Sequence, residues 1–317
     1  MRNTMRSMSE SFQATCSLLD EGLSLYRRHF VSFLLITACW FVPIAIAVGL
    51  IIAAEAWLDE TLVVIFVLIT VLLSFPILIY LIGGLSRAAS AAIEGQPVRI
   101  LSAFAIHPLR ALGMGCYSII YAIIAWIGSS VLSLVCICPL YFVSISAIAG
   151  VTSLSNGTNS ISFALGLLFG VVFASVYLFT FVISGATYSS LIYSLQPWIQ
   201  ELDPFGKAFQ RSFEVIGYRV GRNLIAWSAS ALLITAIGIT VTLTIGVLVP
   251  LPLIFVLGND SHIAQAVSAT AWILGLIFVL PPLPIWMTLL YRRNVAEHEG
   301  IDLDAKIQIW WRECFGA

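Results

Sequence analysis

The sequence predicts an all-α membrane protein with six transmembrane helices, arranged as three hairpins that are each preceded by an amphipathic helix in the plane of the membrane. Three observations lead to this fold class: the composition, six long apolar runs, and polar segments that recur between the runs. Of 317 residues, 60% are hydrophobic and 10% are charged, whereas a soluble domain usually has about 25% charged residues. A water-soluble fold of this length cannot bury so much apolar surface, so we expect residues 1–317 to form one integral membrane domain.

Six stretches are long enough to cross a bilayer, which takes about 20 apolar residues per helix. They cover residues 31–53, 62–84, 112–149, 161–186, 223–257 and 263–291. The third and fifth exceed one bilayer thickness and contain proline, so we expect kinked, tilted or partly re-entrant helices there. The prolines at 281–284 also allow a broken sixth helix.

The connecting segments predict the orientation. The loops at 54–61, 150–160 and 258–262 contain four acidic residues and no lysine or arginine, and all fifteen basic residues lie in the other connections and the termini. Lysine and arginine are enriched on the cytoplasmic side of membrane proteins. We therefore expect a multi-pass protein of the cell (inner) membrane with both termini in the cytoplasm.

Amphipathic patterns precede the first, third and fifth spans. Apolar residues recur every three or four positions at 12–30 and 205–220, and less regularly at 100–109. This spacing places them on one face of a helix. We predict three cytoplasmic helices that lie along the membrane surface. A C-terminal interfacial helix is predicted within 303–317, where Trp310 and Trp311 favour the interface.

The predicted helix and two spans recur about every hundred residues, which gives repeat units of 9–96, 97–203 and 204–302. Four residues at the end of the second span recur at an offset of 205 positions. They are Pro76, Arg87, Glu94 and Gly95, which match Pro281, Arg292, Glu299 and Gly300. We interpret each set as a span exit followed by a glycine that ends the helix in a left-handed conformation. The alternative is that any six-span protein with amphipathic connections shows such similarity.

Three segments carry a resemblance to a known family. They are LLDEGLSLYRRHF at 18–30, DPFGKAFQRSFEVI at 203–216 and YRRNVAEHEGIDLDA at 291–305. Together and in this order they resemble the membrane domain of glycerophosphoryl diester phosphodiesterases, a six-span prokaryotic module. Some members also carry a soluble catalytic barrel, for which this chain has no room. The resemblance therefore implies a stand-alone membrane protein and no phosphodiesterase activity.

No pattern indicates a catalytic, cofactor or metal site. The predicted spans contain no Asp, Glu, Lys, Arg or His, and such residues are the usual sign of an ion pathway or a proton relay. The sequence also lacks the common metalloprotease, hydrolase and phosphate-loop motifs. We expect a protein that is not an enzyme and needs no cofactor.

The polar residues at the predicted cytoplasmic boundary are the main functional indication, because arginines there can contact anionic lipid headgroups. They are Arg27, Arg28, Arg87, Glu94, Gly95, Arg211, Arg219, Arg222, Arg292, Arg293, Glu299 and Gly300. Small residues on two spans are expected to let helices pack closely, with a dimer interface or a lipid-tail groove as the alternative. They are Gly166, Gly170 and Ala174 on the fourth span, and Gly238, Thr242 and Gly246 on the fifth.

These observations predict a non-catalytic membrane protein that organises or regulates partner proteins or lipids at the cytoplasmic face. The expected partners are anionic membrane lipids and membrane or cytoplasmic proteins. A net charge of −1 argues against nucleic acid. The alternative is a channel or transporter for a neutral or amphiphilic solute, in which the three hairpins surround a path. The oligomeric state stays open.

Overall fold

The computed structural model describes residues 2–54, 59–128, 130, 159–201, 204–258 and 261–300, and this part of the chain contains helices and no strand. Six of its helices are long and apolar enough to cross a membrane. They span Phe30–Ile52, Thr61–Ile93, Pro108–Gly128, Leu178–Gln200, Val220–Leu257 and His262–His298. The predicted all-α class, the membrane location and the six spans are thereby confirmed.

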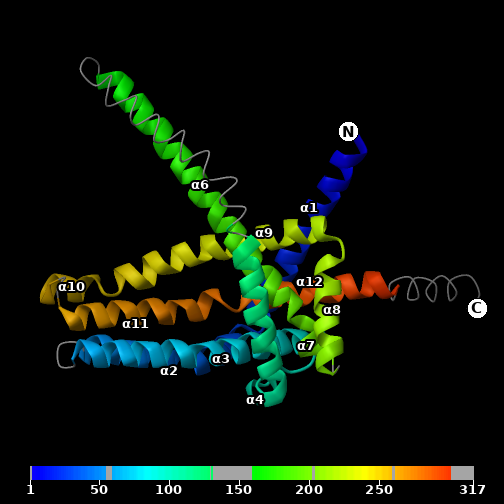
Figure 1. Ribbon diagram of the computed structural model, residues 1–317, viewed down its shortest axis with the longest axis horizontal. Helices are drawn as coiled ribbons and strands as arrows, with labels where there is room; N and C mark the ends of the chain where they lie inside the picture. The colour runs from blue at the N-terminus through cyan, green and yellow to red at the C-terminus, as the bar shows by residue number, and fades with distance from the viewer. Residues whose placement is uncertain are drawn as a thin grey trace, which may run out of the picture.

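The first hairpin consists of α2 (Phe30–Ala54) and α3 (Glu60–Ile93), which pack side by side in Figure 1. It follows α1 (Arg2–Arg28), with only His29 between the two helices. Helix α3 has 34 residues, which corresponds to about 51 Å at 1.5 Å per residue. A hydrocarbon layer is about 30 Å thick, so α3 continues well beyond one bilayer thickness, as predicted from the position of Glu94.

The second hairpin differs from the prediction at its start. Helix α4 (Ile100–Ala103) has only four residues, so the amphipathic helix expected at 100–109 is reduced to a single turn. Proline disfavours a helical conformation in the residue before it, and a new helix begins at Pro108, where a missing N–H costs nothing. This Pro108–Gly128 helix contains the start of the third predicted span. The rest of that span, to residue 149, lies outside the described residues except Ser130.

The fourth span lies within α6 (Asn159–Ser194), which contains the whole predicted range 161–186 and is followed by the short α7 (Gln196–Gln200). Helix α8 (Phe205–Gly217) begins after Pro204, as predicted. The fifth span is divided into α9 (Val220–Val241), a π-helical segment η1 (Thr242–Leu248) and α10 (Leu251–Leu257). Its excess length and prolines therefore produce an irregular helix.

The sixth span consists of two helices, α11 (His262–Val279) and α12 (Pro282–Glu299). Pro281 and Pro282 lack N–H groups and cannot continue the helical hydrogen-bond pattern. The carbonyl of Phe278, which would have bonded to residue 282, accepts a hydrogen bond from Tyr26 Oη of α1 at 3.3 Å. Burial raises the pKa of Tyr26 to about 12, so this hydroxyl stays protonated as a donor. Tyr26 thus compensates for one bond that the proline removes.

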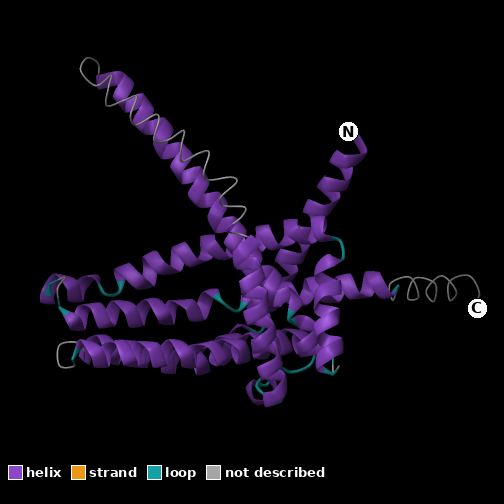
Figure 2. Cartoon of the chain, viewed as in Figure 1, coloured by secondary structure: helices purple, strands orange, loops and turns teal. Residues whose placement is uncertain are grey.

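Figure 1 shows α2, α3, α11 and the α9–α10 segment extending together to the left, while α8 crosses the opposite end and α6 diverges from the row. Short loops join most of these helices (Figure 2). The largest fully buried side chains come mainly from α1, α2, α3, α6, α12 and the Pro108–Gly128 helix, and α12 contacts α1, α3, α6 and α9. Every residue from 281 to 291 is buried. We call this part of the molecule, formed by α1, α7, α8 and α12, the α12 end.

The outer surfaces of the spans are apolar. Phe255 and Val256 of α10 are each 82% exposed, and most large side chains in the first half of α3 are exposed as well. Lipid tails can cover such surfaces because the helices satisfy their own backbone hydrogen bonds. The protein therefore has a region with apolar outer surfaces that lipid can cover, and a separate packed core at the α12 end.

Candidate functional site

Two helices, α3 and α12, terminate at the predicted glycines, and both of these helix termini belong to the α12 end of the molecule. Gly95 and Gly300 have φ angles of 70° and 71°, in the left-handed region. After α3, the Gln96 N–H donates to the Ala91 carbonyl at 2.8 Å and the Gly95 N–H donates to the Ala92 carbonyl at 3.1 Å. This is a Schellman motif, which satisfies carbonyls that the helix end leaves free. The expected helix stops are confirmed at both glycines.

Several arginines that were expected at the headgroups pair with carboxylates of neighbouring helices. The pairs are Arg292 with Glu94, Arg293 with Glu21, and Arg219 and Arg222 with Glu297. Arg292 and Glu94 are 31% and 45% exposed, and exposed pairs of this kind contribute only about 0–1 kcal/mol. Their main effect is to connect α12 to α1, to α9 and to the loop after α3.

The remaining predicted boundary residues are spread around the same end. Arg27 and Arg28 are exposed in the last turn of α1, and the Arg87 guanidinium donates to the Ala105 carbonyl. Arg211 of α8 lies 3.7 Å from Glu214. The Glu299 side chain lies outside the described residues. Contact of any of these residues with lipid headgroups stays a prediction.

The small residues of the fifth span pack against α11. Thr242 Oγ1 accepts a hydrogen bond from Trp272 Nε1 at 3.1 Å, and a Cβ at Gly246 would lie 3.0 Å from Trp272 Cδ1. A Cβ at Gly238 would lie 3.7 Å from Val279. These contacts support helix packing within the chain. Gly166, Gly170 and Ala174 lie in the part of α6 whose side chains the structure does not describe.

A buried amide at Gln196 connects four helices. Gln196 is fully buried, and its Nε2 donates to Ser86 Oγ at 3.1 Å and to the Ile192 carbonyl at 3.0 Å. Its Oε1 accepts from Thr288 Oγ1 at 3.1 Å and from Gln200 Nε2 at 2.8 Å. All four hydrogen-bonding positions of the side chain are therefore used. This network joins α3, α6, α7 and α12.

Two further buried amides, Asn294 and Asn223, form a second network with Tyr193. Asn294 Nδ2 donates to Tyr193 Oη at 2.7 Å and to Asn223 Oδ1 at 2.9 Å, and Asn223 Nδ2 donates to the Tyr218 carbonyl at 2.8 Å. Asn294, Asn223 and Tyr193 are all buried. Sequence reasoning missed Gln196, Asn223 and Asn294. The available signal was an amide beside or inside a long apolar run.

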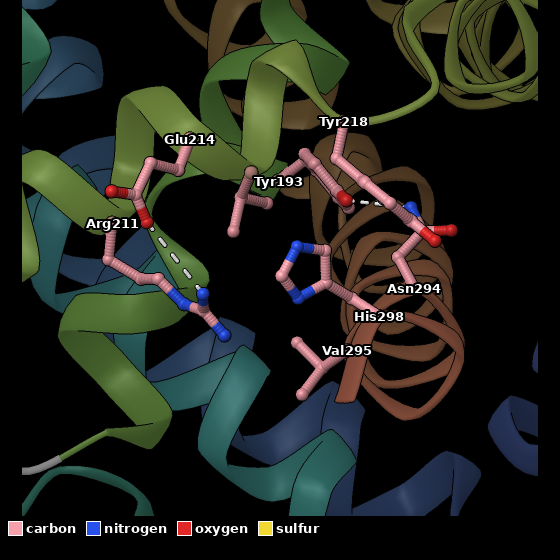
Figure 3. A pocket seen from close by; sticks show the side chains of 8 residues that line it. Tyr193, Arg211, Glu214, Tyr218, Asn294, Val295 and His298 are labelled. Atoms are coloured by element: carbon pink, nitrogen blue, oxygen red, sulfur yellow. Dashed lines mark hydrogen bonds and ion pairs between the residues drawn. The ribbon is translucent and has the colours of Figure 1, made fainter. Parts of the chain in front are cut away.

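Beside this pair lies a small pocket between α8 and α12 (Figure 3). Its lining residues are Tyr193, Arg211, Glu214, Val215, Tyr218, Asn294, Val295 and His298. The His298 ring packs edge-on against Tyr218, with 4.9 Å between the ring centroids, whereas the neighbouring Glu297 pairs with α9. The neighbouring side chains at 297 and 298 therefore lie on different faces of α12.

The chemistry of this pocket is limited. Its volume of about 30 Å³ is enough for water but far below the few hundred Å³ of a typical ligand pocket. Its lining contains no serine, threonine or cysteine that His298 could activate as a nucleophile. No three His, Cys, Asp or Glu side chains among the described residues lie close enough to hold a metal ion. The arrangement is that of a small polar gap between two packed helices.

No protein-family profile, curated protein or solved structure matches the chain. The resemblance to the glycerophosphoryl diester phosphodiesterase membrane domain thus rests on the three sequence segments alone.

Proposed function

We propose that this chain is a non-catalytic membrane protein that organises or regulates partner proteins or lipids at the cytoplasmic face of the cell membrane. The observation that carries the proposal is the position of the core. The buried amides, the ion pairs and the most buried helix all lie at the α12 end, whereas the spans have apolar outer surfaces. A membrane protein built in this way has a rigid, polar face for contacts outside the lipid tails.

The orientation and the surface helices form part of the same proposal. The basic residues of the described loops lie at the α12 end, which favours a cytoplasmic location. Helix α8 crosses the direction of the spans in Figure 1 and exposes the aromatic rings of Phe205 and Phe213. An amphipathic helix with such exposed rings is suited to the headgroup region. The threefold repeat and membership of the resembled family are proposed with it.

The test is co-purification of the full chain after extraction in mild detergent, with native mass spectrometry as the readout. We expect lipids or proteins to be retained, and retention to fall at least threefold in an Arg27→Gln, Arg28→Gln double variant. The control is Phe255→Ala, which changes an exposed residue at the opposite end and should leave retention unchanged. Recovery of neither lipid nor protein with the wild-type chain contradicts the proposal.

An open pocket between α11 and the fifth span favours the alternative of a channel or transporter for a neutral or amphiphilic solute. It has a volume of about 380 Å³, and Gln265, Ser268 and Trp272 of α11 line it. Against a polar path, the hydroxyls of Thr240 and Thr244 donate to carbonyls of their own helix. Glycerol uptake into liposomes that exceeds the empty-liposome rate and is lost in Gln265→Leu would establish the alternative.

A further inference from the structure

An open cavity at the α12 end, separate from the pocket in Figure 3, has a lining whose charged residues are mostly arginines; we call it the arginine cavity. It lies between α3, α4, α7 and α12 and has a volume of about 370 Å³. Its charged lining residues are Arg87, Arg99, Arg110, Arg292 and Glu94. Four guanidinium groups thus face one space with a single carboxylate, which leaves three positive charges in the lining without a matching acid.

The contacts of these arginines leave donors available. Arg292 is the arginine that pairs with Glu94. Arg87 and Arg110 each donate to a backbone carbonyl, in the case of Arg110 that of Glu201 at 3.2 Å. The Arg99 side chain forms no hydrogen bond or ion pair with another described residue. Arg292 Nε also donates to Gln200 Oε1 at 3.3 Å. Each guanidinium has five N–H donors, so most donors in this cavity have no acceptor among the described residues.

A further polar group points to a missing acceptor. The Ser90 side chain lines the same cavity, and its Oγ is buried without a hydrogen-bond partner among the described residues. Buried polar atoms nearly always have a partner. An anion in the cavity could accept from Ser90 and from the arginines together, and it would reduce the repulsion between the guanidinium groups.

The geometry of α3 indicates two possible carriers of this anion. Pro76, Tyr80 and Arg87 are spaced by four and seven residues and therefore share one helix face. Pro76 and Tyr80 line an apolar groove of about 280 Å³ against the Pro108–Gly128 helix. The groove lies about 10 Å along α3 from Arg87, a separation that suits an acyl chain and its headgroup. Ile106 packs over Gly83, which lies on α3 between the groove and the cavity. Because Ile106 separates the two spaces, the cavity is also suited to an anion that has no acyl chain.

We propose that the arginine cavity binds a phosphate group, carried by an anionic phospholipid or present as free phosphate. Guanidinium groups are well matched to phosphate because two N–H donors can bind two of its oxygens. The lipid as carrier rests on the proposed function, since it requires the α12 end to lie at a lipid surface. Phosphate recognition itself does not depend on it.

The test uses the purified full chain in uncharged detergent. Dioleoyl phosphatidylglycerol is titrated with native mass spectrometry as the readout, and inorganic phosphate with calorimetry. We expect Arg99→Gln and Arg87→Gln each to weaken binding about tenfold, because each change removes charge-assisted hydrogen bonds to the phosphate. Lys207→Gln is the matched control, because it removes one positive charge from an exposed position on α8 outside the cavity. It should leave affinity unchanged.

The results of the two titrations distinguish a phospholipid headgroup from free phosphate as the ligand of the cavity. Tight binding of the lipid that depends on Arg99 and Arg87 supports a headgroup site, and the same dependence for inorganic phosphate alone supports a site for the free ion. Binding that is equal in the wild-type chain and in both variants, or no binding of either probe, overturns the proposal. Arg99 has no described side-chain partner, so Arg99→Gln should keep the wild-type melting temperature. If phosphate binds but no partner or lipid co-purifies from membranes, the proposed function fails and the phosphate site stands.

Discussion

Gln196 illustrates at the residue scale how this protein accommodates polar groups beside its apolar spans. A buried amide without partners costs free energy, whereas one whose donors and acceptors are all used costs little. The four partners of Gln196 come from four helices. The side chain therefore specifies how these helices are positioned relative to one another, because a shift of any one of them would leave a polar atom unpaired.

Replacing Gln196 by alanine should destabilise the protein. The change leaves Ser86 and Thr288 with unpaired polar atoms and opens a cavity, so we expect a loss of about 2–4 kcal/mol in the free energy of unfolding. The measurement is reversible unfolding in mixed micelles with increasing SDS. Gln210→Ala is the control, since Gln210 is exposed on α8 and bonds only to Glu214. Equal effects of the two variants would show that the buried network does not stabilise the fold.

Some residues of the α12 end could be predicted and others could not. Gly95 and Gly300 were predictable because a left-handed helix end strongly favours glycine. Arg219, which also has a positive φ of 49°, gave no signal, since its conformation depends on the turn between α8 and α9. The buried amides were missed because asparagine and glutamine near a predicted boundary are usually solvated. Only the tertiary contacts show that they lie in the core.

At the scale of elements, the contact between α1 and α12 depends on a close approach. The fully buried Trp286 of α12 donates from Nε1 to the Leu19 carbonyl of α1 at 3.0 Å. Its ring lies over Gly22, where a Cβ would be only 2.3 Å from Trp286 Cδ1. The absence of a side chain at position 22 therefore determines how near the two helices lie.

A Gly22→Ala substitution should separate α1 from α12. We expect a loss of about 1–3 kcal/mol from overpacking, even though alanine favours helix formation. Gly206→Ala on α8 is the matched control, because a Cβ there meets nothing within 4 Å. The melting temperature in detergent, followed by tryptophan fluorescence, distinguishes them. A Gly22→Ala protein as stable as Gly206→Ala would mean that Trp286 can move at no cost.

The positions of the helices could largely be predicted from the sequence, whereas the part that each helix takes in the packed core could not. Long apolar runs identified the six spans because burial of the backbone in lipid requires such runs. The break before Pro282 follows from proline chemistry, but neither the end of α4 at Ala103 nor the positions where helices resume could be predicted from it. The sequence of Pro282–Glu299 predicts the end of a span followed by its exit. Its burial at the centre of the core could not be predicted, since the spacing of its apolar residues resembles that of a lipid-facing helix.

At the scale of the whole molecule, the core and the lipid-facing region are displaced from each other along the spans. Tertiary stability is concentrated at the α12 end, where side chains from α1, α3, α6, α9 and α12 interlock. The opposite end of the bundle consists of helices with mostly exposed apolar surfaces. This division suits an α12 end that lies outside the lipid tails and an opposite end that is surrounded by them.

Labelling of single cysteines tests the proposed orientation. In a background with the six native cysteines replaced by alanine, Gln96→Cys lies at the α12 end and Ser261→Cys lies between α10 and α11. We expect a membrane-impermeant maleimide to label position 261 on intact spheroplasts and to label position 96 only after permeabilisation. The permeabilised sample serves as the reactivity control for both sites. The reverse pattern would place the α12 end outside the cell.

The interruption at Leu280 and Pro281 has a mechanical consequence. Helix α11 contacts α2 and the irregular fifth span, whereas α12 is held by the core, and no continuous hydrogen-bond ladder joins the two. A bilayer that is thinner or thicker than the span length makes helices tilt. Here α11 can change its tilt at the interruption while α12 keeps its amide and arginine contacts. We therefore expect the joint between the two helices to keep the core at the α12 end in place when the lipid thickness changes.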